Sequence, residues 1–338
     1  MTESKGKAVA LMSGGLDSAL AAAWTKRLGF PVVGLHVVTG LVDQRDLVRA
    51  QGAELGVPVR IWDAADEYLE VLKNPQFGRG QGMNPCLDCH IFLLRKAKEF
   101  MEQEGAAFVV TGEVLGQRPM TQNRQTLALI AQATGLGEKL VRPLSGRLLG
   151  PTFPERMGWV QREDWLDLQG RSRKQQLGLA RELGISRFTP PSGCCVLVDP
   201  GFSARLRDLL REKGAEAITW EDLSILRLGR HFRLGPNLRL VVGRDAQENE
   251  KLMVFGRNRY VLMFSEVPGP VGLILGEPNE ADLFLCAQIA ARYSDAPKDA
   301  PVRVHIRRNG EEKELWVTPL SPADPRLVQW RIGVPKRL

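Results

Sequence analysis

The chain has 338 residues, of which 43% are hydrophobic and 25% are charged, as is ordinary for a folded globular protein. This length exceeds that of one small domain and predicts two. No apolar run approaches the roughly 18 residues of a membrane-spanning helix, which excludes an integral membrane protein of that kind. The N-terminal residues lack the layout of a signal peptide, so we expect a cytoplasmic protein whose cysteines are ligands or reactive thiols.

The charge balance permits a polyanionic partner without establishing one. Lysine and arginine number 46 against 39 acidic residues, which gives a formal net charge of +7. Basic residues concentrate between Arg142 and Arg187 and between Arg227 and Arg259. Aromatic residues are interleaved with them, namely Trp159, Trp165, Phe188, Phe232 and Tyr260. The mixture is typical of an RNA-binding surface, and equally of solvated helix faces around core aromatics.

The first predicted elements are a strand, a glycine turn and a helix. The apolar run at 8–12 predicts the strand, SGGLDS at Ser13–Ser18 the turn, and the alanine-rich stretch at 19–27 the helix. Gly14 and Gly15 let backbone N–H groups approach an anion, toward which the helix also directs the positive end of its dipole. The turn is therefore expected to bind an anion.

Polar side chains of this turn suit a bound triphosphate. The hydroxyl groups of Ser13 and Ser18 add hydrogen-bond donors, and Asp17 is suited to hold Mg²⁺. No Gly-Lys-Ser/Thr string follows, so the turn is not a Walker A loop. It resembles instead the PP-loop of enzymes that cleave ATP to AMP and pyrophosphate. An ordinary glycine turn that caps a helix is the alternative.

Beyond the turn, apolar runs alternate with helical patterns. The runs lie at 31–38, 57–62 and 107–111, and the helical patterns at 44–55, 65–72 and about 86–104. This alternation predicts an α/β fold with a doubly wound parallel sheet. Ligands of such sheets bind beyond the strand C-termini, where we expect Ser13–Ser18, His36–Gly40 and Thr111–Gly112. His36 is expected to line the nucleotide site, although a histidine here is as often structural.

Four cysteines lie in two pairs. Cys86 and Cys89 open a predicted helix, whose N-terminus favours the thiolate form. Cys194 and Cys195 are adjacent in a later, proline-flanked loop. The thiols suit a zinc site, or a 4Fe-4S cluster held by Cys86, Cys89 and one of the later pair. Cys286, in an apolar helical pattern, is expected to be a small core residue.

The pattern changes after residue 200. A helical linker is predicted over 200–226, followed by a small α+β domain over 227–338. Its strands are predicted at 232–234, 238–242, 260–264, 271–275, 302–306 and 313–317, and its helices at 247–255 and 279–293.

The order of the motifs carries a family resemblance. SGGLDS, PCLDCH at 85–90, VTGEVLGQ at 110–117 and LVRPL at 140–144 resemble, in this order, the catalytic domain of tRNA 4-thiouridine synthases (ThiI). They resemble the tRNA 2-thiouridylases more loosely. The resemblance covers residues 5–199 and implies an adenine nucleotide α-hydrolase-like, PP-loop fold. In the second domain, VVGRDAQEN at 241–249 is similar to the NFACT-R module, which implies RNA binding.

The resemblance implies an ATP-dependent tRNA sulfurtransferase. A uridine carbonyl oxygen would attack the α-phosphorus of Mg-ATP, pyrophosphate would leave, and sulfur would replace the adenylated oxygen to give 4-thiouridine or 2-thiouridine. The partners implied are tRNA and a sulfur donor, either a cysteine desulfurase or inorganic sulfide. The three-cysteine pattern, without a rhodanese domain, favours a 4Fe-4S cluster over persulfide chemistry, with zinc as the alternative.

The resemblance also assigns residue roles. It gives catalytic roles to Asp17, Cys86, Cys89 and Cys195. It assigns nucleotide contacts to Ser13, Gly14, Gly15, Asp17, Ser18, His36 and Gly112. The cluster ligands implied are Cys86, Cys89 and Cys195, because the later pair is similar to the Gly-x-Cys loop of the 2-thiouridylases; Cys194 is the alternative third ligand. Glu113 and Gln117, after a predicted strand, are candidates to orient the base.

Two other functions fit parts of the sequence. One is a PP-loop ligase or sulfur-inserting enzyme that acts on a small molecule and holds zinc at its cysteines. The other is a non-enzymatic RNA-binding protein with a vestigial nucleotide fold, which the complete turn at Ser13–Ser18 disfavours. The sequence leaves open which uridine is modified and whether its carbon 2 or carbon 4 receives sulfur.

Overall fold

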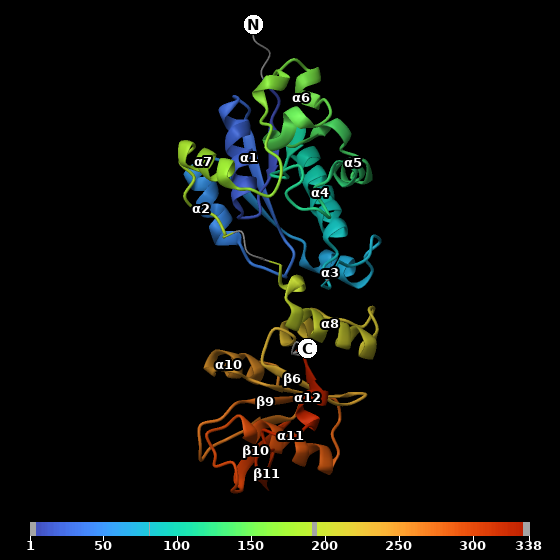
Figure 1. Ribbon diagram of the computed structural model, residues 1–338, viewed down its shortest axis with the longest axis vertical. Helices are drawn as coiled ribbons and strands as arrows, with labels where there is room; N and C mark the ends of the chain where they lie inside the picture. Colours follow the sequence, from blue (N-terminus) through green and yellow to red (C-terminus); the bar gives the residue numbers. More distant parts are fainter. Residues whose placement is uncertain (1–4, 81, 191–194, 334–338) are drawn as a thin grey trace. The chain divides into compact units, whose positions relative to one another are not determined.

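Figure 1 shows the computed structural model of the chain, which describes residues 5–80, 82–190 and 195–333. The chain divides into two compact units, Met1–Val196 and Leu197–Leu338. Cys194 lies outside the described residues. Within the described part of the chain, no helix is both long and apolar enough to cross a membrane.

The first unit is built on a five-stranded parallel sheet with the strand order β3-β2-β1-β4-β5. Its strands are β1 (Ala8–Leu11), β2 (Val32–Val38), β3 (Val59–Asp63), β4 (Phe108–Val110) and β5 (Leu140–Val141). The chain builds outward from β1 in one direction through β2 and β3, and in the other through β4 and β5. This confirms the predicted doubly wound sheet and places its switch point between β1 and β4.

Helices cover both faces of this sheet (Figure 1). They are α1 (Leu16–Arg27), α2 (Arg45–Leu55), α3 (Ala65–Lys73), α4 (Cys86–Gln103), α5 (Arg124–Ala133), α6 (Phe153–Arg156) and α7 (Lys174–Glu182). Short 3₁₀ helices are η1 (Gly137–Lys139), η2 (Pro143–Leu148), η3 (Arg162–Asp164) and η4 (Val196–Val198). Ala8 and Ala10 of β1 pack into a core with α1 and α7, whereas Val9 packs into a core with α4 and α5. Because both faces are covered, strands β1, β4 and β5 consist of apolar residues only.

The second unit contains a seven-stranded antiparallel sheet with the order β11-β10-β8-β9-β7-β6-β12. The strands are β6 (Arg230–Gly235), β7 (Leu238–Val242), β8 (Val261–Met263), β9 (Gly272–Leu275), β10 (Val302–Arg308), β11 (Glu311–Val317) and β12 (Arg331–Ile332). The helices are α8 (Pro200–Lys213), α9 (Trp220–Ile225), α10 (Ala246–Val254), α11 (Glu280–Arg292) and α12 (Arg326–Trp330). This is the α+β arrangement that the sequence predicted.

Each face of the second sheet has its own core. Leu240 of β7 packs with Cys286 and its neighbours on α11, and Val241, the next residue, packs with Leu252 of α10 on the opposite face. Cys286 is fully buried, as expected for a core residue. Helix α8 joins the sheet through Asp208, which accepts hydrogen bonds from Arg233 and Arg239 at 2.6 Å each.

The core also contains side chains that the sequence offered as RNA contacts. Trp165 and Phe232 are fully buried, and Trp159 packs against Phe30 and Phe153 with ring centroids 6.3 and 5.7 Å apart. For Trp165 and Phe232 the core interpretation therefore holds, because their burial leaves no ring face for a base.

Candidate nucleotide and thiol site

The turn between β1 and α1 exposes backbone N–H groups at the start of the helix. Gly14 has φ +80°, a left-handed conformation that favours glycine. Gly15 is the N-cap residue of α1 and provides no capping side chain. The Ser18 hydroxyl instead holds the turn together, since it accepts from the Ser13 N–H at 3.2 Å and donates to the Gly15 carbonyl at 2.9 Å. The first N–H groups of α1 are therefore left for an anion.

Gly112 is required by the close approach of two loops. A Cβ atom at this position would lie 2.3 Å from the carbonyl carbon of Asp17 and 2.4 Å from the nitrogen of Ser18. No real side chain tolerates such distances, so only glycine lets the loop after β4 pack against the turn. The structure thus brings Gly112 and the predicted turn residues together at the C-terminal edge of the sheet.

Asp17 lies in a network that the sequence did not predict. Its Oδ2 atom accepts from Gln117 Nε2 at 2.7 Å and from Arg173 Nη2 at 2.9 Å. Gln117 in turn accepts from Gln176 Nε2 of α7 at 3.1 Å. The Oδ1 atom of Asp17 is buried and has no hydrogen-bond partner. A carboxylate oxygen in this state, beside free helix N–H groups and a guanidinium, fits a Mg²⁺-bound triphosphate.

A segment from much later in the chain is attached to the same turn. The Gly14 carbonyl accepts from the Thr189 N–H at 3.0 Å and from Gln51 Nε2 at 3.1 Å. Gln51 also donates to the Arg187 carbonyl at 2.7 Å. These bonds anchor the stretch that precedes the later cysteine pair next to the glycine turn.

His36 lies inside β2 rather than after its end, which differs from the expected position. It is buried, and its Nδ1 donates to the Met12 carbonyl at 2.8 Å. Burial lowers the pKa of His36 and favours the neutral ring. Its Nε2 is buried without a partner and is available as an acceptor.

The described cysteines of the predicted thiol site come near one another. Cys86 is the first residue of α4, and its Sγ accepts a hydrogen bond from Asn84 Nδ2 at 2.9 Å. Cys89, one turn later, is hydrogen-bonded to the hydroxyl of buried Tyr68. Cys86 and Cys195 both lie close enough to Cys89 to act on it electrostatically.

The local charge environment of Cys89 differs from the expectation. Burial raises the pKa of Cys89 to about 12, and the nearby Cys195 and Cys86 add to this rise. The hydrogen bond from Tyr68 acts in the opposite direction and lowers the pKa. The expected lowering at a helix N-terminus is therefore overridden by desolvation. Among residues 5–80, 82–190 and 195–333, no group of three histidine, cysteine or carboxylate side chains stands in metal-ligating geometry. The donor set is nevertheless soft, and its two hydrogen-bond donors suit a thiolate-bound iron or zinc centre.

Glu113 connects the two halves of the site. It is buried, and its carboxylate accepts from Arg142 Nε at 2.8 Å and from His90 Nδ1 at 3.1 Å. Burial opposes its ionisation, but Arg142 and His90 outweigh burial and hold the pKa of Glu113 at about 2. Glu113 follows Gly112, and His90 follows Cys89. A continuous set of contacts therefore links the glycine turn to α4.

Comparison with known proteins assigns the chain. Residues 3–147 match the family described as thiamine biosynthesis protein (ThiI), and residues 229–331 match the NFACT protein RNA binding domain. A tRNA-specific 2-thiouridylase MnmA of Streptomyces griseus subsp. griseus is 33% identical over 348 residues, which cover 91% of this chain and 83% of that protein. The chain belongs to the tRNA thiouridylase family.

Other relatives of this thiouridylase carry similar names. The tRNA-specific 2-thiouridylase MnmA of a Nocardioides species is 26% identical over 340 residues, covering 90% of this chain and 86% of that protein. Among solved structures, a 4-thiouridine synthetase–RNA complex with bound ATP aligns over 53% of this chain and 52% of its own, at 21% identity and a TM-score of 0.34. By its two family matches, the chain combines a ThiI PP-loop domain with an NFACT-type RNA-binding domain.

Proposed function

We propose that this thiouridylase adenylates a uridine carbonyl oxygen of tRNA at the glycine turn and replaces that oxygen with sulfur at the nearby thiols. The observation that supports it is the contact path between the two sites. Gly112 packs against Asp17, Glu113 bonds to His90, and His90 adjoins Cys89. An activated base held at the turn would therefore lie close to a sulfur carried by α4.

In this proposal the turn residues bind ATP and stabilise the leaving pyrophosphate. The N–H groups after Gly14 and Gly15 surround the phosphate oxygens, and Asp17 holds Mg²⁺ through its unpartnered Oδ1. Arg173 supplies positive charge to the pyrophosphate as the bond to the α-phosphorus breaks. The carbonyl oxygen of the base forms the new bond to the α-phosphorus and later leaves within AMP.

Cys86, Cys89 and Cys195 are proposed to hold a 4Fe-4S cluster, with Cys194 as the alternative third ligand. When bound, such a cluster supplies sulfide at an iron that has no protein ligand. Asn84 and Tyr68 orient the first two sulfurs through their hydrogen bonds. Residues 5–199 would form the catalytic domain, 200–226 a helical linker, and 227–338 the domain that binds tRNA.

One set of variants tests both halves of this proposal. Asp17→Ala is expected to abolish tRNA-dependent AMP formation while tRNA affinity stays within about twofold, because Asp17 serves the nucleotide rather than the RNA. A variant that binds tRNA and still forms AMP at the wild-type rate would contradict the role of Asp17. Unfolding of Asp17→Ala would indicate that the turn is structural.

Iron and sulfide analysis after anaerobic purification tests the thiol half. Cys86→Ala and Cys195→Ala are expected to lose iron, whereas the buried Cys286→Ala in the second unit keeps it and serves as the matched control. If iron is retained in Cys195→Ala but lost in Cys194→Ala, Cys194 rather than Cys195 is the third cluster ligand. Stoichiometric zinc without iron would exclude the cluster.

A further inference from the structure

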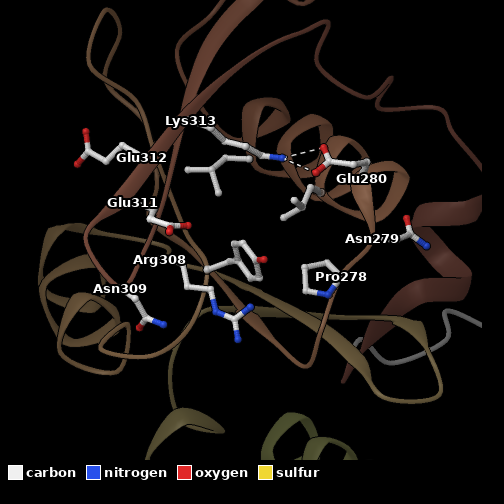
Figure 2. A pocket seen from close by; sticks show the side chains of 11 residues that line it. Pro278, Asn279, Glu280, Arg308, Asn309, Glu311, Glu312 and Lys313 are labelled. Atoms are coloured by element: carbon white, nitrogen blue, oxygen red, sulfur yellow. Dashed lines mark hydrogen bonds and ion pairs between the residues drawn. The ribbon is translucent and has the colours of Figure 1, made fainter.

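The charged side chains of the second unit divide into two kinds. One kind surrounds an open pocket of about 680 Å³ between α11 and the β10–β11 hairpin (Figure 2). There Arg308 forms a two-fold contact with Glu277 at 2.7 Å, and Lys313 bonds to Glu280 at 2.7 Å. Two further acidic residues line the pocket, Glu311 and Glu312. Its cations are neutralised, so this pocket does not favour a polyanion.

The second kind is a cluster of arginines that form no ion pair with a carboxylate among residues 5–80, 82–190 and 195–333. Arg230 of β6 lies 4.7 Å from the Tyr293 ring centroid, and Arg292 of α11 lies 5.3 Å from the same ring. Arg331 of β12 is paired with Phe232 in the sheet, which places it diagonally across from Arg230 on one face. None of the ion pairs formed between described residues includes Arg230, Arg292 or Arg331.

Within the described part of the chain, burial and neighbouring arginines oppose the positive charge of Arg230. Burial lowers the pKa of Arg230, and Arg331 and Arg244 lower it further, against the opposing effects of Tyr293 and Glu248. Glu248 is already bonded to Arg244. Gathering like charges without a counter-ion costs free energy, which a bound anion would recover.

We propose that the cluster of Arg230, Arg292 and Arg331 around Tyr293 is where the second unit binds backbone phosphates of tRNA. Guanidinium groups match phosphate oxygens with paired N–H donors, and the Tyr293 ring holds two of them in fixed orientation. The inference rests on the proposed function, and it places the RNA on this cluster rather than on the pocket beside Arg308.

The test compares charge-removing variants of the full-length chain. Arg230→Gln and Arg331→Gln are each expected to weaken tRNA binding about tenfold at low salt and to reduce the salt slope of log K by roughly 1. Arg308→Gln and Arg303→Gln remove the same charge from salt-bridged sites and are expected to change the affinity less than twofold. Arg230→Lys keeps the positive charge and is therefore expected to keep the wild-type salt slope of log K.

The outcomes separate this inference from the function on which it rests. Equal losses of tRNA affinity in all four glutamine variants would mean that only the net charge of the protein matters. That result would overturn the proposed role of the cluster. Unchanged binding by Arg331→Gln, an exposed position where folding is not at stake, would overturn it as well. If tRNA binding depends on these arginines but the protein forms no AMP in the presence of tRNA, only the proposed sulfurtransferase activity is contradicted.

Discussion

Single side chains at this site depend on hydrogen-bond partners, some of which are distant in the sequence. Asn84 and Tyr68 each donate to a cysteine sulfur, and Glu113 joins Arg142 to His90. The role of Glu113 differs from the expected one of orienting a base, because both of its oxygens are occupied by protein donors. We assign it a positioning role that keeps His90, and with it the start of α4, beside the loop after β4.

Replacing Glu113 is expected to destabilise the first unit strongly. Glu113→Gln would leave the buried guanidinium of Arg142 without its counter-charge, at a cost of about 3–5 kcal/mol in the free energy of unfolding at pH 7. Denaturant unfolding measures this cost. Glu138→Gln breaks the exposed pair with Arg156 and is the control, with an expected change below about 0.5 kcal/mol.

The pH dependence of the same contact has a definite sign. The pKa of Glu113 in the folded protein, about 2, lies below the ordinary glutamate value of 4.5. Its contribution is therefore fully present above about pH 4.5 and is lost as the pH falls toward about 2. The stability difference between wild type and Glu113→Gln should accordingly shrink across that window. A difference that stays constant from pH 6 to pH 3 would show that folding does not lower the pKa of Glu113.

At the scale of elements, α7 and the segment before it complete the proposed nucleotide site. Arg173 immediately precedes α7, and Gln176 lies within its first turn. Both reach the carboxylate of Asp17, Arg173 directly and Gln176 through Gln117. The packing of α7 against α1 therefore sets where these polar groups meet the glycine turn.

Removing the charge of Arg173 is expected to impair the chemistry more than the fold. Arg173→Gln should lower tRNA-dependent pyrophosphate release about 100-fold, in line with the loss of one preorganised group that stabilises developing charge. Arg171→Gln removes an exposed arginine two residues away and should retain wild-type release. Wild-type pyrophosphate release by Arg173→Gln, or an equal loss in both variants, would remove Arg173 from the site.

Local patterns in the sequence predicted the elements better than the contacts between them. The strand, glycine turn and helix at residues 8–27 could be predicted because each is encoded by its own residues. Arg173 could not be assigned, since only the packing of α7 on α1 brings it to Asp17. The raised pKa of Cys89 could not be predicted either, because burial reverses the lowering of a thiol pKa that a helix N-terminus is expected to produce. Burial likewise decides between the two interpretations that the sequence left open for Trp165, an RNA contact and a core residue.

At the scale of the whole molecule, each unit has its own cores. Phe108 and Leu94 belong to the cores of the first unit, and Leu240 and Leu252 to those of the second. A unit with its own core can unfold as a cooperative body. We therefore expect calorimetry of the full chain to show two thermal transitions.

Two variants assign the transitions. Leu240→Ala opens a cavity in the second unit and should lower one midpoint by roughly 8 °C, because losing a buried leucine side chain costs about 3 kcal/mol. Glu113→Gln should lower the other midpoint and leave the first unchanged. If both variants shift one common transition, the units fold as a single cooperative body. In that case the proposed adenylation site and the arginine cluster would be energetically coupled, and a substitution at either would change the stability of the other.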